Sequence, residues 1–164
     1  MAWSACNDMH KIWSSQLSNN LKIKIFRATV EPILLYGSET WTLSRKLEKR
    51  LEGTYTRLLI RAQSLSWKSH PSITKIYDKL PHVSPLAKYR RIQFAGHCFR
   101  ADAEVISSLL LWRPCYGHSR GRKLSFPDVI SRDTGLSTED LKTAMRDRKV
   151  WCDIVQSMIA TAVE

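Results

Sequence analysis

Five basic side chains at helical spacing are the residues of this sequence best suited to bind a charged partner. They lie within residues 44–63, where the apolar side chains recur on one stripe at about 100° per residue. The basic residues share one flank of this stripe, whereas Glu48 and Glu52 lie on the other flank. A solvated face of an amphipathic helix has a similar composition, but the separation by sign favours a surface that binds an anion. The five candidates are Lys46, Lys49, Arg50, Arg57 and Arg61.

Further basic residues could extend this surface. Residues 113–123 are rich in glycine and basic side chains, and we expect them to form an exposed basic loop. Glycine there would let the backbone approach a phosphate closely, although a mobile charged loop without a function has the same composition. These additional nucleic-acid-binding candidates are Lys68, Arg90, Arg91, Arg120, Arg122 and Lys123.

Motifs with a known catalytic mechanism are absent from the sequence. It contains no P-loop, no GxGxxG, no HExxH, no CxxC and no GxSxG string. The one adjacent acidic pair, Glu139-Asp140, lies at an expected helix start, where acidic side chains compensate the helix dipole. We therefore predict no catalytic residue and no cofactor, and we do not expect the chain to be an enzyme on its own.

Two pairs of residues are of the types that bind zinc, His97-Cys98 and Cys115 with His118. Adjacent side chains on a helix point about 100° apart, so His97 and Cys98 are poorly placed to bind one ion together. A buried cysteine more often acts as a small hydrophobic residue. The four cysteines are widely spaced, which in an intracellular chain favours reduced thiols. We predict no metal site.

The elements that must position these residues are predicted to be mainly α-helices. Asn19 and Ser44 are suited to cap helices, and Ser84 followed by proline is a further helix start. Pro32 should kink or end its helix, and Gly96 costs roughly 1 kcal/mol relative to alanine unless a close neighbour needs the space. The expected helices are 1–16, 21–37, 44–63, 72–80, 84–100 and 126–133, followed by one last helix from Ser137; 105–112 is helix or strand, and 39–43 is extended.

Length and charge indicate the class of partner. The 164 residues suffice for one domain or two small ones, and 43% hydrophobic residues with six Trp can form a core. The net charge is +11, and residues 1–126 hold 21 of the 26 basic residues but 8 of the 15 acidic ones. Such a surface favours a polyanion as binding partner.

No apolar run approaches the roughly 20 residues of a membrane span, and no signal peptide is seen. We expect a soluble intracellular protein, in the nucleus or cytoplasm, without a membrane partner.

Several strings, in order along nearly the whole chain, add a resemblance to a known family. They occupy residues 28–62, 65–70, 89–100, 109–114, 119–123 and 132–155, and the most specific are LLYGSETWTL and RIQFAGHCFR. They resemble the region that follows the polymerase palm in non-long-terminal-repeat (LINE-type) retrotransposon reverse transcriptases.

The resemblance implies a thumb-like helical segment in residues 1–66, and a helical C-terminal extension in 67–164 that carries the basic loop. The thumb of such enzymes packs on the template–primer duplex, whereas the palm, with its paired magnesium-binding aspartates, is missing here. Neither a cysteine–histidine knuckle nor a restriction-like endonuclease is found.

We therefore expect a non-catalytic fragment that holds an RNA–DNA hybrid or duplex DNA by its phosphates. The missing palm and fingers are a further expected partner, because the tryptophan-containing N-terminus starts as though its packing neighbour preceded Met1. Two alternatives stay open at this point. The chain could be a protein-interaction module, or it could be a functionless remnant of a decayed retroelement.

Overall fold

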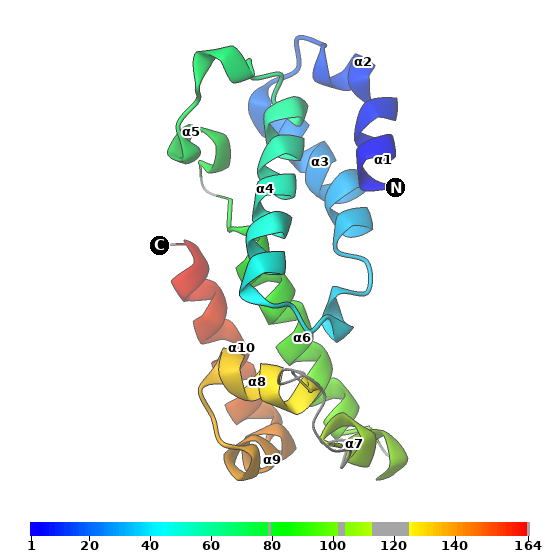
Figure 1. The fold of residues 1–164 in the computed structure, drawn as a ribbon, viewed down its shortest axis with the longest axis vertical. Coiled ribbons are helices and arrows are strands. Elements are labelled where there is room, and N and C mark those ends of the chain that lie inside the picture. Colours follow the sequence, from blue (N-terminus) through cyan, green and yellow to red (C-terminus); the bar gives the residue numbers. More distant parts are fainter. Residues whose placement is uncertain (79, 102–103, 113–124, 164) are drawn as a thin grey trace. The chain divides into compact units, whose positions relative to one another are not determined.

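The computed structural model of the chain describes residues 1–78, 80–101, 104–112 and 125–163 (Figure 1). Every regular element within these ranges is a helix, so the predicted mainly α fold is confirmed. The chain divides into two compact units: the first comprises 1–37 and 44–84, and the second comprises 38–43 and 85–164. The first unit ends at Ser84 instead of the expected residue 66, and the helix Ile73–Tyr77 within the added part contacts the helix Arg45–Ala62. None of the described helices is both long and apolar enough to cross a lipid bilayer.

The first unit is arranged around one helix, α4, which contacts α1, α2, α3 and α5 (Figure 1). The expected apolar stripe forms its inner face: Tyr55, Leu58 and Ala62 are completely buried, although Leu47 in the first turn is 46% exposed. The ring of Tyr55 packs edge-on against Phe26 of α3 with 5.6 Å between ring centroids. The elements are α1 (Ala2–Asp8), α2 (His10–Trp13), α3 (Asn19–Leu34), α4 (Arg45–Ala62), the 3-10 helix η2 (Trp67–Ser69) and α5 (Ile73–Tyr77).

The cap of helix α3 lies one residue earlier than expected. The hydroxyl of Ser18 accepts the backbone N–H of Leu21 at 3.4 Å, so Ser18 caps the helix in place of Asn19. Asn19 is the first helical residue, and its side-chain amide donates to Gln63 Oε1 at 3.3 Å. Pro32 lies in the last turn of α3, which ends two residues later at Leu34, so the helix stops short of the expected Gly37.

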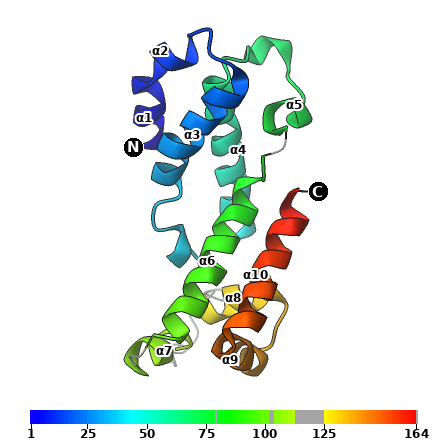
Figure 2. The ribbon, with the colours of Figure 1, turned by 180° about the vertical axis from the view of Figure 1, so that it is seen from behind.

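The second unit contains the remaining helices and a core of its own. Residues 39–43, expected to be extended, begin inside a short 3-10 helix, and the segment 105–112 is helical as far as Leu110. Helices α6 and α10 lie side by side (Figure 2). The elements are η1 (Ser38–Thr40), α6 (Val83–Phe99), α7 (Glu104–Leu110), α8 (Phe126–Thr134), α9 (Thr138–Arg146) and α10 (Arg148–Val163). The buried core cluster is Ile92, Ala95, Leu110, Ile130, Leu141, Met145, Trp151 and Val155.

A glycine explains how closely α6 and α10 pack. A Cβ atom built on Gly96 of α6 would lie 2.1 Å from Nε1 and 2.2 Å from Cδ1 of Trp151 on α10. The indole N–H of Trp151 donates to the backbone oxygen of Ile92 at 3.0 Å, so the ring lies directly on the α6 backbone. The close neighbour that would justify a glycine inside this helix is therefore Trp151.

The last predicted helix is two helices, and Asp147 separates them. Asp147 has an extended backbone conformation that ends α9. Its carboxylate then accepts the backbone N–H groups of Lys149 at 2.8 Å and Val150 at 3.3 Å, which caps α10. The expected start at Ser137 is confirmed, since its hydroxyl accepts the N–H of Asp140 at 3.2 Å.

Candidate nucleic-acid interface

The five basic residues predicted on one flank of α4 are all exposed in the structure. They lie on the surface that remains when α4 buries its apolar stripe against the rest of the first unit. Within the part of the chain that the structure describes, none of the five forms an ion pair with a carboxylate. We call this surface the α4 basic face; it comprises Lys46, Lys49, Arg50, Arg57 and Arg61.

Glu52, on the acidic flank of α4, is held by contacts within the first unit. One carboxylate oxygen of Glu52 accepts the backbone N–H of Ser84 at 2.8 Å, and the other accepts the hydroxyl of Tyr77 at 3.2 Å. The ring Nδ1 of His82 lies 3.4 Å from the same carboxylate. Burial, with a smaller contribution from Glu52, raises the pKa of Tyr77 to about 12. This carboxylate is therefore tied to α5 and the start of α6, away from the basic flank.

A second carboxylate near α4 is also satisfied internally. The hydroxyl of Tyr55 donates to Glu31 Oε2 of α3 at 2.6 Å, and Glu31 is only 6% exposed. Burial, and then this carboxylate, raise the pKa of the Tyr55 hydroxyl above its ordinary value. Because Glu31 and Glu52 are both engaged inside the unit, their charges do not neutralise the α4 basic face by direct pairing.

A glycine at the centre of the α4 basic face was missed by the sequence analysis. At 100° per residue, Gly53 lies between the positions of Lys49 and Arg57. It is exposed, and a Cβ atom added there would have no neighbouring atom within 4 Å. The face therefore has no side chain at its middle, where the bare helix backbone is accessible. The signal available in the sequence was the position of this glycine, four residues from both Lys49 and Arg57.

Arg91 is buried, so the prediction that it lies at the binding surface is wrong. We expected it to contact a phosphate, but it is completely buried, and its guanidinium donates to the buried carboxylate of Asp133. Arg132 also contacts this carboxylate, with 3.2 Å between Nη2 and Oδ1. Arg91 is therefore part of the interior of the second unit and is not available to a ligand at the surface. Sequence periodicity could not identify this, because the partner lies on α8, far along the chain.

The other candidates outside α4 have different environments. Lys68 is exposed in η2 of the first unit, and Arg90 is half-buried on α6 of the second. The basic loop, with Arg120, Arg122 and Lys123, lies outside the described residues.

The zinc-type residues are only partly described, because Cys115 and His118 also lie outside these ranges. His97 is exposed, whereas Cys98 is half-buried, and burial raises the pKa of its thiol. Among the residues that the structure describes, no three His, Cys, Asp or Glu side chains are grouped so that they could hold a metal ion.

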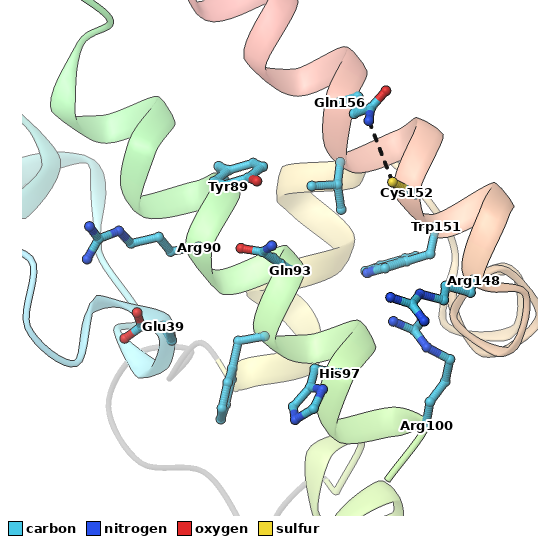
Figure 3. A pocket seen from close by; sticks show the side chains of 12 residues that line it. Glu39, Tyr89, Arg90, Gln93, His97, Arg100, Arg148, Trp151, Cys152 and Gln156 are labelled. Carbon is cyan, nitrogen blue, oxygen red and sulfur yellow. Dashed lines mark hydrogen bonds between the residues drawn. The ribbon is translucent and has the colours of Figure 1, made fainter.

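The second unit contains a cavity of about 510 Å³ between α6 and α10, which the sequence analysis did not anticipate (Figure 3). Arg100 from the end of α6 and Arg148 from the start of α10 both line it. Trp151 and Tyr89 contribute aromatic surface. The available signal was Arg148, which interrupts the apolar positions of the C-terminal segment and marks the place where one predicted helix becomes two.

Comparison with known proteins gives a distant similarity. The chain is 24% identical over 172 aligned residues to a Caenorhabditis elegans protein named as an uncharacterized transposon-derived protein. The alignment covers 94% of this chain but 61% of that protein, so the chain spans less than two thirds of its relative. No family model matches the chain, and no solved structure matches it. The similarity is consistent with a transposon-related origin of this chain.

Proposed function

We propose that this chain is a non-catalytic, nucleic-acid-binding segment derived from a transposon reverse transcriptase. In this proposal the α4 basic face holds the phosphates of an RNA–DNA hybrid or duplex DNA. The observation that carries the proposal is the exposure of five basic side chains on one face of α4, without carboxylate partners in the described residues. The transposon-derived relative and the strings that resemble LINE-type reverse transcriptases support it.

The dimensions of the face suit a duplex. Lys46 and Arg61 are fifteen positions apart on one helix, which corresponds to about 22 Å at a rise of 1.5 Å per residue. A duplex advances about 3.4 Å per base pair, so this length matches about six to seven base pairs. Gly53 leaves the middle of the face bare, which lets a phosphate backbone approach the helix closely.

Such contacts hold a duplex with little sequence preference, because phosphates carry no base identity. Lys68 of the first unit, Arg90 of the second unit and the loop residues Arg120, Arg122 and Lys123 are proposed as further phosphate contacts, each in its own part of the chain. Arg91 is excluded because it is buried and paired with Asp133.

A charge-matched pair of variants tests the proposal. The first replaces three residues of the α4 basic face: Lys46→Gln, Arg50→Gln and Arg57→Gln. The control replaces three exposed lysines of the same unit, on α2, α3 and α5: Lys11→Gln, Lys24→Gln and Lys75→Gln. Both variants lose three positive charges, so the long-range attraction of a duplex falls equally.

Fluorescence anisotropy with a labelled RNA–DNA hybrid and a DNA duplex measures the affinity. We expect the α4 variant to lose on the order of a hundredfold in affinity, and the control to lose about threefold or less. Circular dichroism checks that both variants keep their helical content. Equal losses in the two variants would show that only net charge matters, and the α4 basic face would then have no specific role.

A second candidate function is docking on a separately made palm and fingers region. Trp3 on α1 is 42% exposed, as is Leu21 on α3, so apolar surface is available at the N-terminal side of the first unit. Co-elution of this chain with a polymerase fragment that ends before its own thumb tests this candidate. A Trp3→Ser variant that co-elutes as well as the unchanged chain would exclude a contact through this tryptophan.

A further inference from the structure

We infer that the cavity between α6 and α10 of the second unit binds a nucleotide, with its phosphate held by Arg100 and Arg148. This site is separate from the α4 basic face, and the inference does not depend on duplex binding by α4. The same chemistry, a nucleoside monophosphate, can come from a free nucleotide or from an unpaired nucleotide at the end of a strand.

The two arginines provide the phosphate site. Figure 3 shows the guanidinium groups of Arg100 and Arg148 close to each other at one end of the cavity. Among the described residues neither has a carboxylate partner, and Glu39, the one acidic side chain that lines the cavity, lies at the opposite end (Figure 3). Two adjacent guanidinium groups repel each other, and an anion placed between them removes this repulsion. Arginine forks match the oxygens of a phosphate.

Local structure orients the side chain of Arg100 and sets the backbone position of Arg148. Nη1 of Arg100 donates to the backbone oxygen of Met145 at 2.8 Å, which orients its guanidinium. Arg148 is the first residue of α10, and its place follows from the helix break at Asp147. Because Arg100 is already oriented, it loses less side-chain entropy on binding than a freely moving arginine would.

The rest of the cavity suits a base and a sugar. Its volume of about 510 Å³ is within the range of small-ligand sites. Half-buried Tyr89 gives it aromatic surface on which a base can stack, whereas Trp151 is 2% exposed and belongs to the core behind the cavity. Gln93 of α6 and Gln156 of α10 also line it, and their amides can donate to and accept from a base edge; Nε2 of Gln156 lies 3.7 Å from Cys152 Sγ (Figure 3). A phosphate end and an aromatic, amide-lined end together favour a nucleotide over a free inorganic anion.

Isothermal titration calorimetry of the full chain with adenosine monophosphate, uridine monophosphate and adenosine tests the inference. We expect both nucleotides to bind at submillimolar to millimolar concentration, and adenosine to bind at least about tenfold more weakly because it lacks the phosphate. Arg148→Gln should weaken nucleotide binding about tenfold or more. Lys149→Gln, a neighbouring exposed residue that does not line the cavity, is the matched control and should bind as the unchanged chain does.

Two further measurements assign the source of the nucleotide and separate this site from α4. If a duplex with a one-nucleotide overhang binds more tightly than a blunt duplex, and Arg148→Gln removes the difference, the ligand is the end of a strand. If the two duplexes bind equally while the free nucleotide still binds, the ligand is the free nucleotide. The α4 triple variant should bind the nucleotides normally. Equal binding of adenosine and its monophosphate, equal losses in Arg148→Gln and Lys149→Gln, or no heat at millimolar nucleotide would each overturn the inference.

Discussion

Gly96 and Gly53 both occupy the interior of a helix, but their surroundings are opposite. A Cβ atom at Gly96 would collide with the indole of Trp151, whereas one at Gly53 would meet nothing within 4 Å. A glycine inside a helix usually destabilises it by roughly 0.5–1 kcal/mol relative to alanine. The glycine at 96 is therefore a packing requirement, and the glycine at 53 has no packing reason within the described structure.

Replacing each glycine by alanine should change stability in opposite directions. We expect Gly96→Ala to lower the free energy of unfolding by about 1–3 kcal/mol, because the added methyl group forces Trp151 from its position. We expect Gly53→Ala to raise it by about 0.5–1 kcal/mol. Urea unfolding followed by circular dichroism measures both. A stabilised Gly96→Ala variant would contradict the close contact with Trp151.

The buried pair of Arg91 and Asp133 predicts a stability effect rather than a binding effect. Removal of one partner leaves a buried charge without its counterion, so Asp133→Ala should destabilise the protein by about 3–5 kcal/mol. The double variant Arg91→Met with Asp133→Leu should recover most of that loss, because both charges are then absent. Thermal unfolding measures the stability of the unchanged chain, the single variant and the double variant. If the double variant folds but binds a duplex much more weakly, Arg91 would have a role at the surface after all.

At the scale of the elements, α5 is attached to α4 through a buried tyrosine that should make the fold sensitive to alkaline pH. Tyr77 bonds to Thr56 at 2.8 Å and to Glu52 at 3.2 Å, and burial raises its pKa to about 12. In the unfolded chain a tyrosine loses its proton near pH 10. The folded state therefore holds a proton that the unfolded state releases between about pH 10 and 12, so stability falls as pH rises through this window.

Tyr77→Phe tests this dependence. The variant should be less stable at pH 8, because its hydrogen bonds are lost, by about 1 kcal/mol. Its free energy of unfolding should also fall less steeply than that of the unchanged chain between pH 9.5 and 11.5, roughly the window set by the two pKa values. Urea midpoints across this range measure the slope. Identical slopes in both proteins would assign the alkaline sensitivity to other groups, such as Tyr55.

The break between α9 and α10 depends on one capping side chain. Asp147 accepts two backbone N–H groups of α10, so Asp147→Ala should cost about 1 kcal/mol of stability. Asp147→Asn keeps a capping oxygen and should lower the free energy of unfolding by only a few tenths of a kcal/mol. Because the break places Arg148 in the cavity, we also expect nucleotide binding to weaken in the alanine variant alone. Urea unfolding and calorimetry on the same samples test both expectations, and unchanged stability of the alanine variant would contradict the capping role.

At the scale of the whole molecule, the net charge of +11 predicts strong salt dependence of duplex binding. If all five residues of the α4 basic face contact phosphates, the logarithm of the binding constant should fall against the logarithm of salt concentration with a slope of about −4 to −5. The α4 triple variant should reduce the magnitude of this slope by about 3, and the lysine control should leave it nearly unchanged. A flat salt dependence would reject phosphate contacts as the basis of binding.

The local features of this chain were predictable because they depend on neighbours a few residues apart. The stripe of Tyr55, Leu58 and Ala62, the cap at Ser137 and the end of α8 at Gly135 follow from helical periodicity and from hydrogen bonds to nearby N–H groups. The exposure of the five basic residues follows in the same way, since they lie beside that stripe. Their phosphate contacts remain a prediction.

By itself, therefore, the sequence determined the helical composition, the inner side of α4 and the sign of the charge beside it, because each depends on short-range spacing. The tertiary structure decided which charges reach the surface and which residues meet across the fold. Arg91 is buried because Asp133 of α8 lies beside it, and Arg100 meets Arg148 because Trp151 packs on Gly96 and α10 starts anew at Asp147. Contacts between residues more than forty positions apart have no local pattern, so only the packed chain could reveal them.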